Sequence, residues 1–180
     1  MTTIILRLEG PLQAWGTPGA AEVRRTHNMP QKRAVLGLIR AAKGMAREET
    51  WLELETLSFQ VLVLKRPRRM WDFGTMANAI SADGKFEHKQ GTQQREYLAD
   101  AAFLVALEGA STLIREIQSA LENPVFLLGL GRRDCVPSHP ILWGLSDLPS
   151  MVTLEGAENC ILEAMELQPA TTNQGTGVVV

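Results

Sequence analysis

Apolar residues within residues 4–107 predict a strand, a helix and two further strands. Residues 4–8 are β-prone and largely apolar, as expected of a strand covered on at least one face, and Gly10 and Pro11 are expected to end it. Over residues 32–47, apolar side chains recur at helical spacing while Arg33, Gly37 and Arg40 fall on the opposite side, which predicts an amphipathic helix. Strands are expected over residues 57–66 and 97–107.

The second half of the chain repeats this alternation. Residues 112–121 predict a helix that Ser111 caps and that Asn123 and Pro124 end. Residues 125–128 are interpreted as a fourth strand, which Gly129 and Gly131 interrupt. The resulting order of strand, helix, strand, strand, helix, strand is that of the split βαβ, or ferredoxin-like, arrangement, which RNA-recognition domains also use. The sequence therefore predicts an α+β fold with a ferredoxin-like core.

A long connection separates the second and third predicted core strands. Residues 67–95 contain three glycines and little periodicity, and a connection of this length inside a compact domain is usually functional or disordered. We expect one domain over residues 1–148 that carries this insertion. A short acidic extension is expected over residues 149–180, in which residues 155–167 could form a helix.

Composition narrows the class of protein without identifying a function. The 180 residues suffice for one domain with a substantial core, and no apolar run approaches the roughly 20 residues that span a bilayer. The start lacks the pattern of a signal peptide, so we expect a cytoplasmic protein with no membrane contact. Cys135 and Cys160 have no metal-ligand spacing and are expected to be reduced thiols. No metal or other cofactor is predicted.

The charges are distributed unevenly along the chain. The 18 cations of residues 1–133 stand against 14 acids, a net charge of +4, whereas the six acids after Arg133 give −6. Residues 24–47 hold seven cations and no acid. Because an exposed helix normally mixes signs to form ion pairs, this run favours an external polyanion as its partner.

Two segments combine residue types suited to RNA. Gln13 and Trp15 follow the first strand, where an aromatic ring could stack on a base and an amide could bind its edge; alternatively, Trp15 caps the core. Residues 129–133 join two glycines to Arg132 and Arg133, which suits phosphate binding by backbone amides and guanidinium groups. The alternative is a plain turn with two solvated arginines.

Four stretches of the chain, taken in order, resemble one known family. They are LRLEGPLQAWG at residues 6–16, MPQKRAVLGLI at 29–39, REYLADAAF at 95–103, and LGLGRRDC at 128–135 with His139 and Pro140 close behind. This pattern resembles the CasD family, the subunit of the type I-E CRISPR surveillance complex (Cascade) that holds the 5′ end of the guide RNA. The resemblance spans residues 4–140. Relatives in this family continue through a longer carboxy-terminal region, so this chain looks short for its kind.

The resemblance implies a non-catalytic subunit that binds the 5′ handle of the crRNA and caps the backbone of the effector complex in antiviral defence. Its partners would be the crRNA, the backbone subunit and the large subunit, with target DNA reached only indirectly. Residues and resemblance together predict these RNA contacts: Gln13, Trp15, Arg24, Arg25, His27, Lys32, Arg33, Arg40, Gly129, Gly131, Arg132 and Arg133.

The insertion supplies a second set of candidate contacts. Its aromatic and basic residues alternate as expected of a surface for single-stranded RNA, although a mobile surface loop would also explain them. The resemblance implies a protruding, thumb-like hairpin here that kinks the guide strand. The candidate thumb residues are Trp71, Phe73, Lys85, Lys89 and Arg95.

A nuclease is the main alternative function. His88, Lys89 and Tyr97 are residue types that serve metal-independent RNA cleavage, and type I-C relatives cut the guide precursor with a Tyr, Lys and His set. The motifs of this chain instead match the I-E branch, in which a separate subunit cuts. A generic RNA-recognition module is a third alternative, but the aromatic pattern typical of that module is absent.

Overall fold

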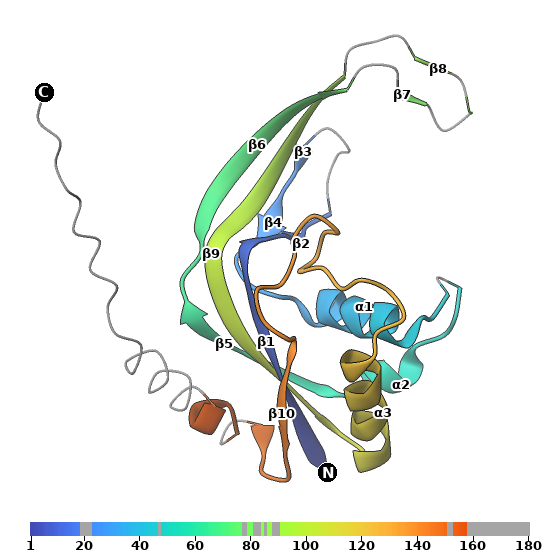
Figure 1. Ribbon diagram of the computed structural model, residues 1–180, viewed down its shortest axis with the longest axis vertical. Coiled ribbons are helices and arrows are strands. Elements are labelled where there is room, and N and C mark those ends of the chain that lie inside the picture. Colours follow the sequence, from blue (N-terminus) through green and yellow to red (C-terminus); the bar gives the residue numbers. More distant parts are fainter. Residues whose placement is uncertain are drawn as a thin grey trace, which may run out of the picture.

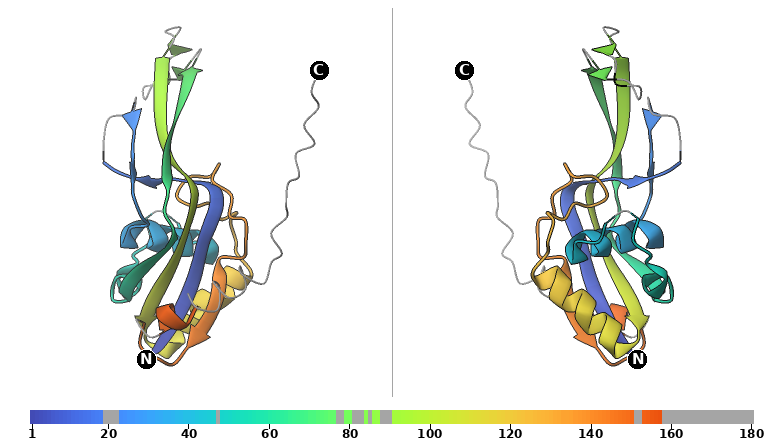
Figure 2. Two further views of the ribbon diagram at one scale, coloured as in Figure 1. Left: turned by 90° about the vertical axis from the view of Figure 1, so that its left-hand side faces the viewer. Right: turned by 90° about the vertical axis from the view of Figure 1, so that its right-hand side faces the viewer.

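The computed structural model describes residues 1–18, 23–46, 48–76, 79–80, 84, 86–87, 91–150 and 153–157. These residues form an α+β fold in which one mixed sheet carries α1, α2 and α3 on one face (Figure 1). Figure 2 shows the same layers from the two sides, with the helices in front of the sheet in its right panel. The principal elements are β1 (Thr2–Gln13), α1 (Lys32–Lys43), α2 (Leu52–Glu55), β5 (Ser58–Lys65), β6 (Arg68–Met76), β9 (Gly91–Gly109), α3 (Ser111–Glu122) and β10 (Leu142–Ser146).

The core lies between the sheet and the helices α1 and α3. Both helices are amphipathic, and α1 buries Val35, Leu36, Leu38, Ile39 and Ala42. They pack with alternate residues of β1 and β9 in one continuous apolar cluster. Burying each large aliphatic side chain contributes about 1.5–3 kcal/mol, so this face of the sheet provides most of the stability. Gly44 ends α1 at a φ of 72°, a left-handed conformation that glycine adopts without steric cost.

The central strand β9 has different neighbours along its two halves. Its carboxy-terminal half pairs with β5, its amino-terminal half pairs with β6, and β1 pairs along the opposite edge from Leu98 onward. The change of partner falls at Asp100, whose φ is 54° and whose carboxylate binds the Arg68 guanidinium at 2.6 Å. The ribbon formed by β6 and residues 91–99 of β9, here called the β6–β9 ribbon, extends away from the helices (Figure 1).

The structure corrects two predicted strand boundaries. Strand β1 continues through Gly10 and Pro11 to Gln13. Pro11 has no N–H to donate, but it lies opposite Asp100, where the ladder is already irregular, so the strand tolerates it. The stretch 67–95, in which the sequence shows little periodicity, contains β6 and the start of β9, which pair as an antiparallel ribbon.

The fourth strand and one helix cap also differ from expectation. Residues 125–128 are irregular, and the Val125 N–H donates to the carbonyl oxygen of Ala42 at 2.9 Å, which attaches this segment to α1. The strand that follows α3 is instead β10, antiparallel to β1. Ala110, not Ser111, occupies the N-cap position of α3, and the Ser111 hydroxyl shares a hydrogen bond with that of Thr2 at 2.8 Å.

Short elements complete the described part of the chain. They are β2 (Trp15–Gly16), β3 (Val23–Arg24), β4 (Thr26–His27), β7 (Ala79–Ile80) and β8 (Phe86–Glu87). Residues 153–157 are helical, and Leu154 packs against the other face of the sheet. The remainder of the helix predicted over residues 155–167 lies outside the described residues. Within the described ranges, no helix has the length and apolar character needed to cross a membrane.

Candidate nucleic-acid interface

A cleft of about 300 Å³ separates α1 from the glycine-rich loop, which comprises residues 129–133. On the α1 side the cleft is lined by Ala34, Gly37 and Ala41, and on the loop side by the two glycines and two arginines of the loop. Nothing lies within 4 Å of the position that a Cβ would occupy at Gly37. Because these lining residues are small, another backbone could come close to the helix here.

The packing of the chain explains why both loop positions are glycine, which the sequence did not reveal. Gly131 has a φ of 90°, and a Cβ there would lie 1.9 Å from the carbonyl oxygen of Ala14. A Cβ at Gly129 would lie 2.3 Å from the carbonyl oxygen of Arg132. The Ala14 N–H also donates to the Leu130 carbonyl oxygen at 3.0 Å. The packing of the protein itself therefore requires glycine at both positions.

The two loop arginines differ in their surroundings. Arg132 is half-buried, with its guanidinium 4.7 Å from the centre of the Tyr97 ring, and it donates to the carbonyl oxygens of Glu96 and Arg24 at 3.1 Å each. Arg133 is exposed, and its side chain has no hydrogen-bond or ion-pair partner within the described part of the chain. Arg132 thus shapes the loop, while Arg133 remains available to an external anion.

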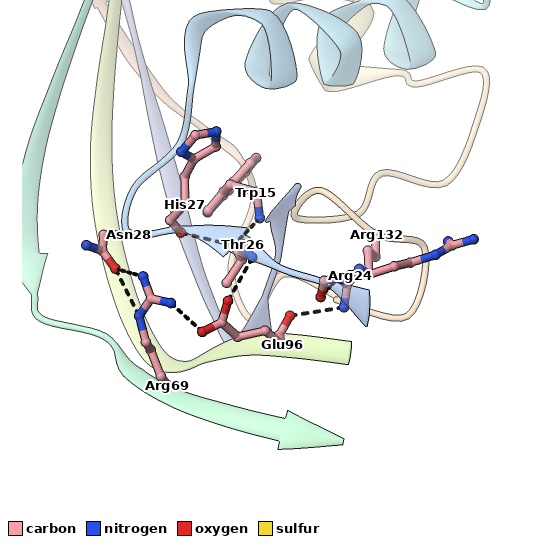
Figure 3. Close-up of polar contacts among 8 residues, drawn as sticks. All are labelled: Trp15, Arg24, Thr26, His27, Asn28, Arg69, Glu96 and Arg132. Atoms are coloured by element: carbon pink, nitrogen blue, oxygen red, sulfur yellow. Dashed lines mark hydrogen bonds and ion pairs between the residues drawn. The ribbon is translucent and has the colours of Figure 1, made fainter. Parts of the chain in front are cut away.

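Residues 23–28, here called the basic segment, lie beside this loop (Figure 3). Strand β3 pairs in parallel with β9, and β4 pairs with β2, so that His27 lies opposite Trp15. Arg24 and Arg25 are exposed and their guanidinium groups have no bonded partner among the residues that the structure describes. His27 is half-buried. The structure therefore brings to neighbouring segments the guanidinium groups of Arg24, Arg25 and Arg133, which have no partner among the described residues.

Several cations on the basic face of α1 have partners within the chain. Lys32 donates to the carbonyl oxygen of Glu55 at 2.7 Å, and Lys43 pairs with Glu116 at 3.0 Å. The guanidinium carbons of Arg33 and Arg40 lie 5.5 and 4.8 Å from the centre of the Trp51 ring. The inference that this run lacks internal partners is thus corrected, because a backbone carbonyl, one acid and an aromatic ring outside residues 24–47 supply them. Arg33 remains exposed.

Gln13 and Trp15 are completely buried. The Gln13 amide donates to the carbonyl oxygens of Leu8 and Ala101 at 3.0 and 2.8 Å, and its oxygen accepts from the Trp15 indole N–H at 3.1 Å. Both residues have 0% exposure, so neither presents a surface to a base. The structure corrects the expectation of direct RNA contact at these two positions and selects the alternative, in which Trp15 belongs to the core.

The β6–β9 ribbon carries exposed aromatic rings. Trp71 and Phe73 are 50% and 61% exposed, and as alternate residues of β6 they lie on one face of the ribbon. Arg95 on β9 donates to Gln93 and lies 4.0 Å from Asp134. The remaining candidate thumb residues, Lys85 and Lys89, lie outside the described residues.

Of the candidate nuclease set, only Tyr97 falls within the described residues; His88 and Lys89 do not. Tyr97 is 3% exposed, and its hydroxyl donates to Asp134 at 2.6 Å, which lowers the pKa of that carboxyl below its ordinary value. Burial raises the pKa of the Cys135 thiol to about 11. Across the residues that the structure describes, no three His, Cys, Asp or Glu side chains gather where they could hold a metal ion.

Comparison with known proteins identifies relatives of this chain. Residues 3–174 match the family model described as CRISPR-associated protein (Cas_Cas5). The chain is 36% identical over 157 residues to the CRISPR system Cascade subunit CasD of Escherichia coli (strain K12), across 78% of this chain and 70% of that protein.

Two solved structures are similar in fold. One, described as the crystal structure of a Cas protein, has a TM-score of 0.67 and 36% identity, with 85% of this chain and 69% of that chain covered. The other, a chain of a CRISPR RNA-guided surveillance complex, has a TM-score of 0.70 and 31% identity, with 78% of this chain covered. This chain covers 61% of that second structure's chain, less than two thirds of its length.

Proposed function

The chain belongs to the Cas5 family of CRISPR-associated proteins, and from this premise we propose that it binds the 5′ handle of the crRNA and caps the backbone of a Cascade-type complex in antiviral defence. The resemblance to CasD that four motifs predicted is confirmed by the family match and by the identity to the E. coli subunit. Likeness to a chain of a surveillance complex supports the role of a Cascade component.

One observation supports the proposal: Arg133 lines a cleft of small residues, the basic segment with Arg24 and Arg25 lies beside it, and these three guanidinium groups have no partner among the described residues. Arg133 lines this cleft, and Arg132 joins the glycine-rich loop to the backbone of the basic segment, which carries Arg24 and Arg25. A single-stranded RNA backbone needs cations along its phosphates and little steric hindrance where it passes. The open face of α1 at Gly37 meets the second requirement.

The sheet order supports a ferredoxin-like core. The order β10-β1-β9-β5 is antiparallel throughout, with α1 between β1 and β5 in sequence and α3 between β9 and β10. This is the pattern that two interlocked βαβ units produce. We assign residues 1–148 to this RNA-binding domain and residues 149–180 to an extension.

The β6–β9 ribbon is proposed to act as the thumb of this domain. Exposed aromatic rings on one face of a ribbon provide surfaces on which unstacked bases can stack. Trp71 and Phe73 meet this description. Neither ring belongs to the apolar core, so their exposure is unexplained by folding alone.

In a Cascade-type complex, this chain would contact other protein subunits as well as RNA. Phe126, Leu127 and Val136 are exposed apolar residues that line a groove of about 460 Å³, and Leu127 is 97% exposed. Apolar surface gathered in this way marks protein-protein contacts. We propose that a neighbouring Cascade subunit, either the backbone subunit or the large subunit, covers this groove, that target DNA is reached only through the complex, and that the chain acts in the cytoplasm.

We propose a binding subunit rather than a nuclease. Tyr97, the described member of the candidate nuclease set, is buried beneath Arg132, and its hydroxyl is engaged by Asp134. A residue that acts on RNA must reach the reacting phosphate or the 2′-hydroxyl.

Co-expression with the neighbouring complex genes tests the proposed function. We expect the chain to co-purify with the other subunits and with short RNAs whose 5′ ends derive from the CRISPR repeat, as RNA sequencing would show. Recovery of the protein complex without any repeat-derived RNA would contradict the proposal.

A further inference from the structure

Glu96 lies at the centre of a buried polar network that joins three cation-bearing segments (Figure 3). Its side chain is 2% exposed on β9. One carboxylate oxygen accepts from the Thr26 N–H of the basic segment at 3.0 Å, and the other forms an ion pair with Arg69 of β6. The Glu96 carbonyl oxygen accepts from Arg132 of the glycine-rich loop at 3.1 Å.

The carboxylate holds the basic segment at two places. Thr26 is bound directly, and its hydroxyl in turn accepts from the Trp15 N–H at 2.7 Å, which attaches the segment to the end of β1. Asn28 is held through Arg69, which donates to the Asn28 side-chain oxygen at 3.2 and 2.6 Å. The segment between these contacts is therefore fixed against the β6–β9 ribbon.

A buried carboxylate costs folding free energy unless it is fully paired, and an apolar residue of similar volume often replaces such a group without loss of stability. Hydrophobic packing alone does not explain Glu96 at this position. Its hydrogen bond to a backbone N–H specifies where the segment lies, which an apolar side chain could not do.

We propose that Glu96 is a positioning residue, whose carboxylate fixes Arg24 and Arg25 at the spacing from Arg133 that an RNA backbone requires. The inference rests on the proposed function in that RNA is the ligand. Glu96 itself would repel a phosphate, so its contribution to binding acts entirely through the basic segment.

The proposed role of Glu96 predicts a change in RNA affinity opposite to the change that the loss of its charge alone would cause. Glu96→Gln removes one negative charge, which by itself strengthens binding to a polyanion. If Glu96 positions the basic segment, the same substitution weakens binding. Asp100→Asn is a matched control: it makes the same chemical change on the same strand, where Asp100 pairs with Arg68, yet it touches no part of the basic segment. Asn accepts the positive φ of that position.

The experiment uses the full chain and a labelled single-stranded RNA that carries the repeat-derived 5′ handle. Hydrogen exchange by mass spectrometry reports on residues 23–28, and titrations at several salt concentrations give Kd and its salt dependence. For Glu96→Gln we expect faster exchange in the basic segment, unchanged exchange in β1, and a Kd raised about tenfold, comparable to the loss of one charged hydrogen bond. The slope of log K against log salt should shrink by about 0.7 for each phosphate that the variant no longer neutralises. Loss of folded protein would lower the active fraction without changing this slope.

Asp100→Asn should bind RNA as tightly as the wild type or more tightly. Unchanged exchange in the basic segment of Glu96→Gln, or binding as tight as that of Asp100→Asn, would overturn the proposal. If the wild type fails to bind the RNA, the proposed function falls, while exchange in residues 23–28 still decides whether Glu96 holds the segment.

Asn28→Ala provides a second variant that keeps the charge constant. Asn28 is exposed, so the fold should survive. The substitution removes the acceptor that receives both Arg69 hydrogen bonds, and we expect a smaller increase in exchange at the end of the basic segment together with a smaller increase in Kd. If both quantities stay at wild-type values, the bridge through Arg69 positions nothing and the proposal is overturned.

Discussion

The indole N–H of Trp15 donates to the side-chain oxygen of Gln13 at 3.1 Å, within a fully buried part of the core. The two residues lie two positions apart at the end of β1, and the Gln13 amide is held by the carbonyl oxygens of Leu8 and Ala101. This pair fixes the point where β1 leaves the sheet and turns toward the cleft. Trp15 therefore supports the glycine-rich loop and the basic segment from within the core.

Alanine substitutions at two tryptophans should distinguish a residue of the core from a residue of the binding surface. Trp15→Ala removes a buried ring and its hydrogen bond, so we expect the free energy of unfolding to fall by about 3–5 kcal/mol. Trp71→Ala removes a half-exposed ring and should leave that free energy nearly unchanged while costing about 1–3 kcal/mol of handle affinity. Urea denaturation and RNA titration of both variants measure the two effects. A stable Trp15→Ala protein with reduced affinity would return Trp15 to the binding surface.

Two glycines that border the same cleft should respond oppositely to alanine. At Gly131 a Cβ would meet the carbonyl of Ala14 at 1.9 Å and the backbone has a positive φ, so Gly131→Ala should destabilise the protein. At Gly37 no atom lies in the way, so Gly37→Ala should stabilise α1 by up to about 1 kcal/mol. Thermal melting compares them. Gly37→Leu should keep the fold but obstruct the cleft, and unchanged RNA affinity in that variant would place the RNA elsewhere.

The unpaired arginines should determine the salt dependence of RNA binding. Replacing Arg24, Arg25 and Arg133 together by Ala should reduce the slope of log K against log salt by about 0.7 per neutralised phosphate, because fewer counterions are released. Arg115→Ala, on the exposed side of α3, is a control for loss of charge outside the cleft. The measurement is a binding titration repeated across salt concentrations. Equal slopes for the wild type and the triple variant would show that these three side chains face solvent in the complex.

RNA cleavage by this chain can be tested in buffer that contains no metal ion. We expect the purified chain to leave repeat RNA intact, and His88→Ala with Lys89→Ala to leave guide processing by the assembled system unchanged. Tyr97→Phe should likewise have no effect on processing. Gel analysis of labelled repeat RNA is the assay, and cleavage that the double substitution abolishes would establish the nuclease instead.

The hydrogen bond between Tyr97 and Asp134 should make stability depend on pH. The bond lowers the pKa of the Asp134 carboxyl in the folded protein, so its stabilisation is complete above the pKa of the unfolded state and is lost as pH falls through the lower folded value. Tyr97→Phe should therefore be less stable than the wild type at neutral pH, with a difference that shrinks as pH falls below the ordinary aspartate pKa of about 3.9. Urea midpoints at several pH values measure this. A difference that is independent of pH would assign the effect to packing of the ring.

The spacing of apolar residues located the helices and strands that bury one face. It missed the segments whose surroundings are supplied by distant parts of the chain. Helices α1 and α3 begin within one residue of their predicted starts, because their apolar faces alone specify them. The run at residues 125–128 resembles a strand, yet its Phe126 and Leu127 are exposed, and a short apolar run does not distinguish these states. The first residues of β9 are polar, and their strand conformation depends on pairing with β6.

The sequence indicated which residue types gather at the candidate site. It did not indicate what each of these residues contacts. The basic segment and the glycine-rich loop do lie together, and Arg24, Arg25 and Arg133 have no partner within the described ranges. Arg132 and Glu96 acquire their roles from contacts at least 27 positions apart in the chain, for which a single sequence holds no signal.

Crosslinking tests the central claim most directly. A handle RNA carrying photoreactive uridines, bound to the wild-type chain and irradiated, can be mapped onto peptides by mass spectrometry. The account predicts crosslinks in the basic segment, in residues 34–41 of α1 and in the glycine-rich loop, with loss of these crosslinks when unlabelled handle RNA competes. Crosslinks confined to other surfaces, such as the face of the sheet that Leu154 covers, would contradict it.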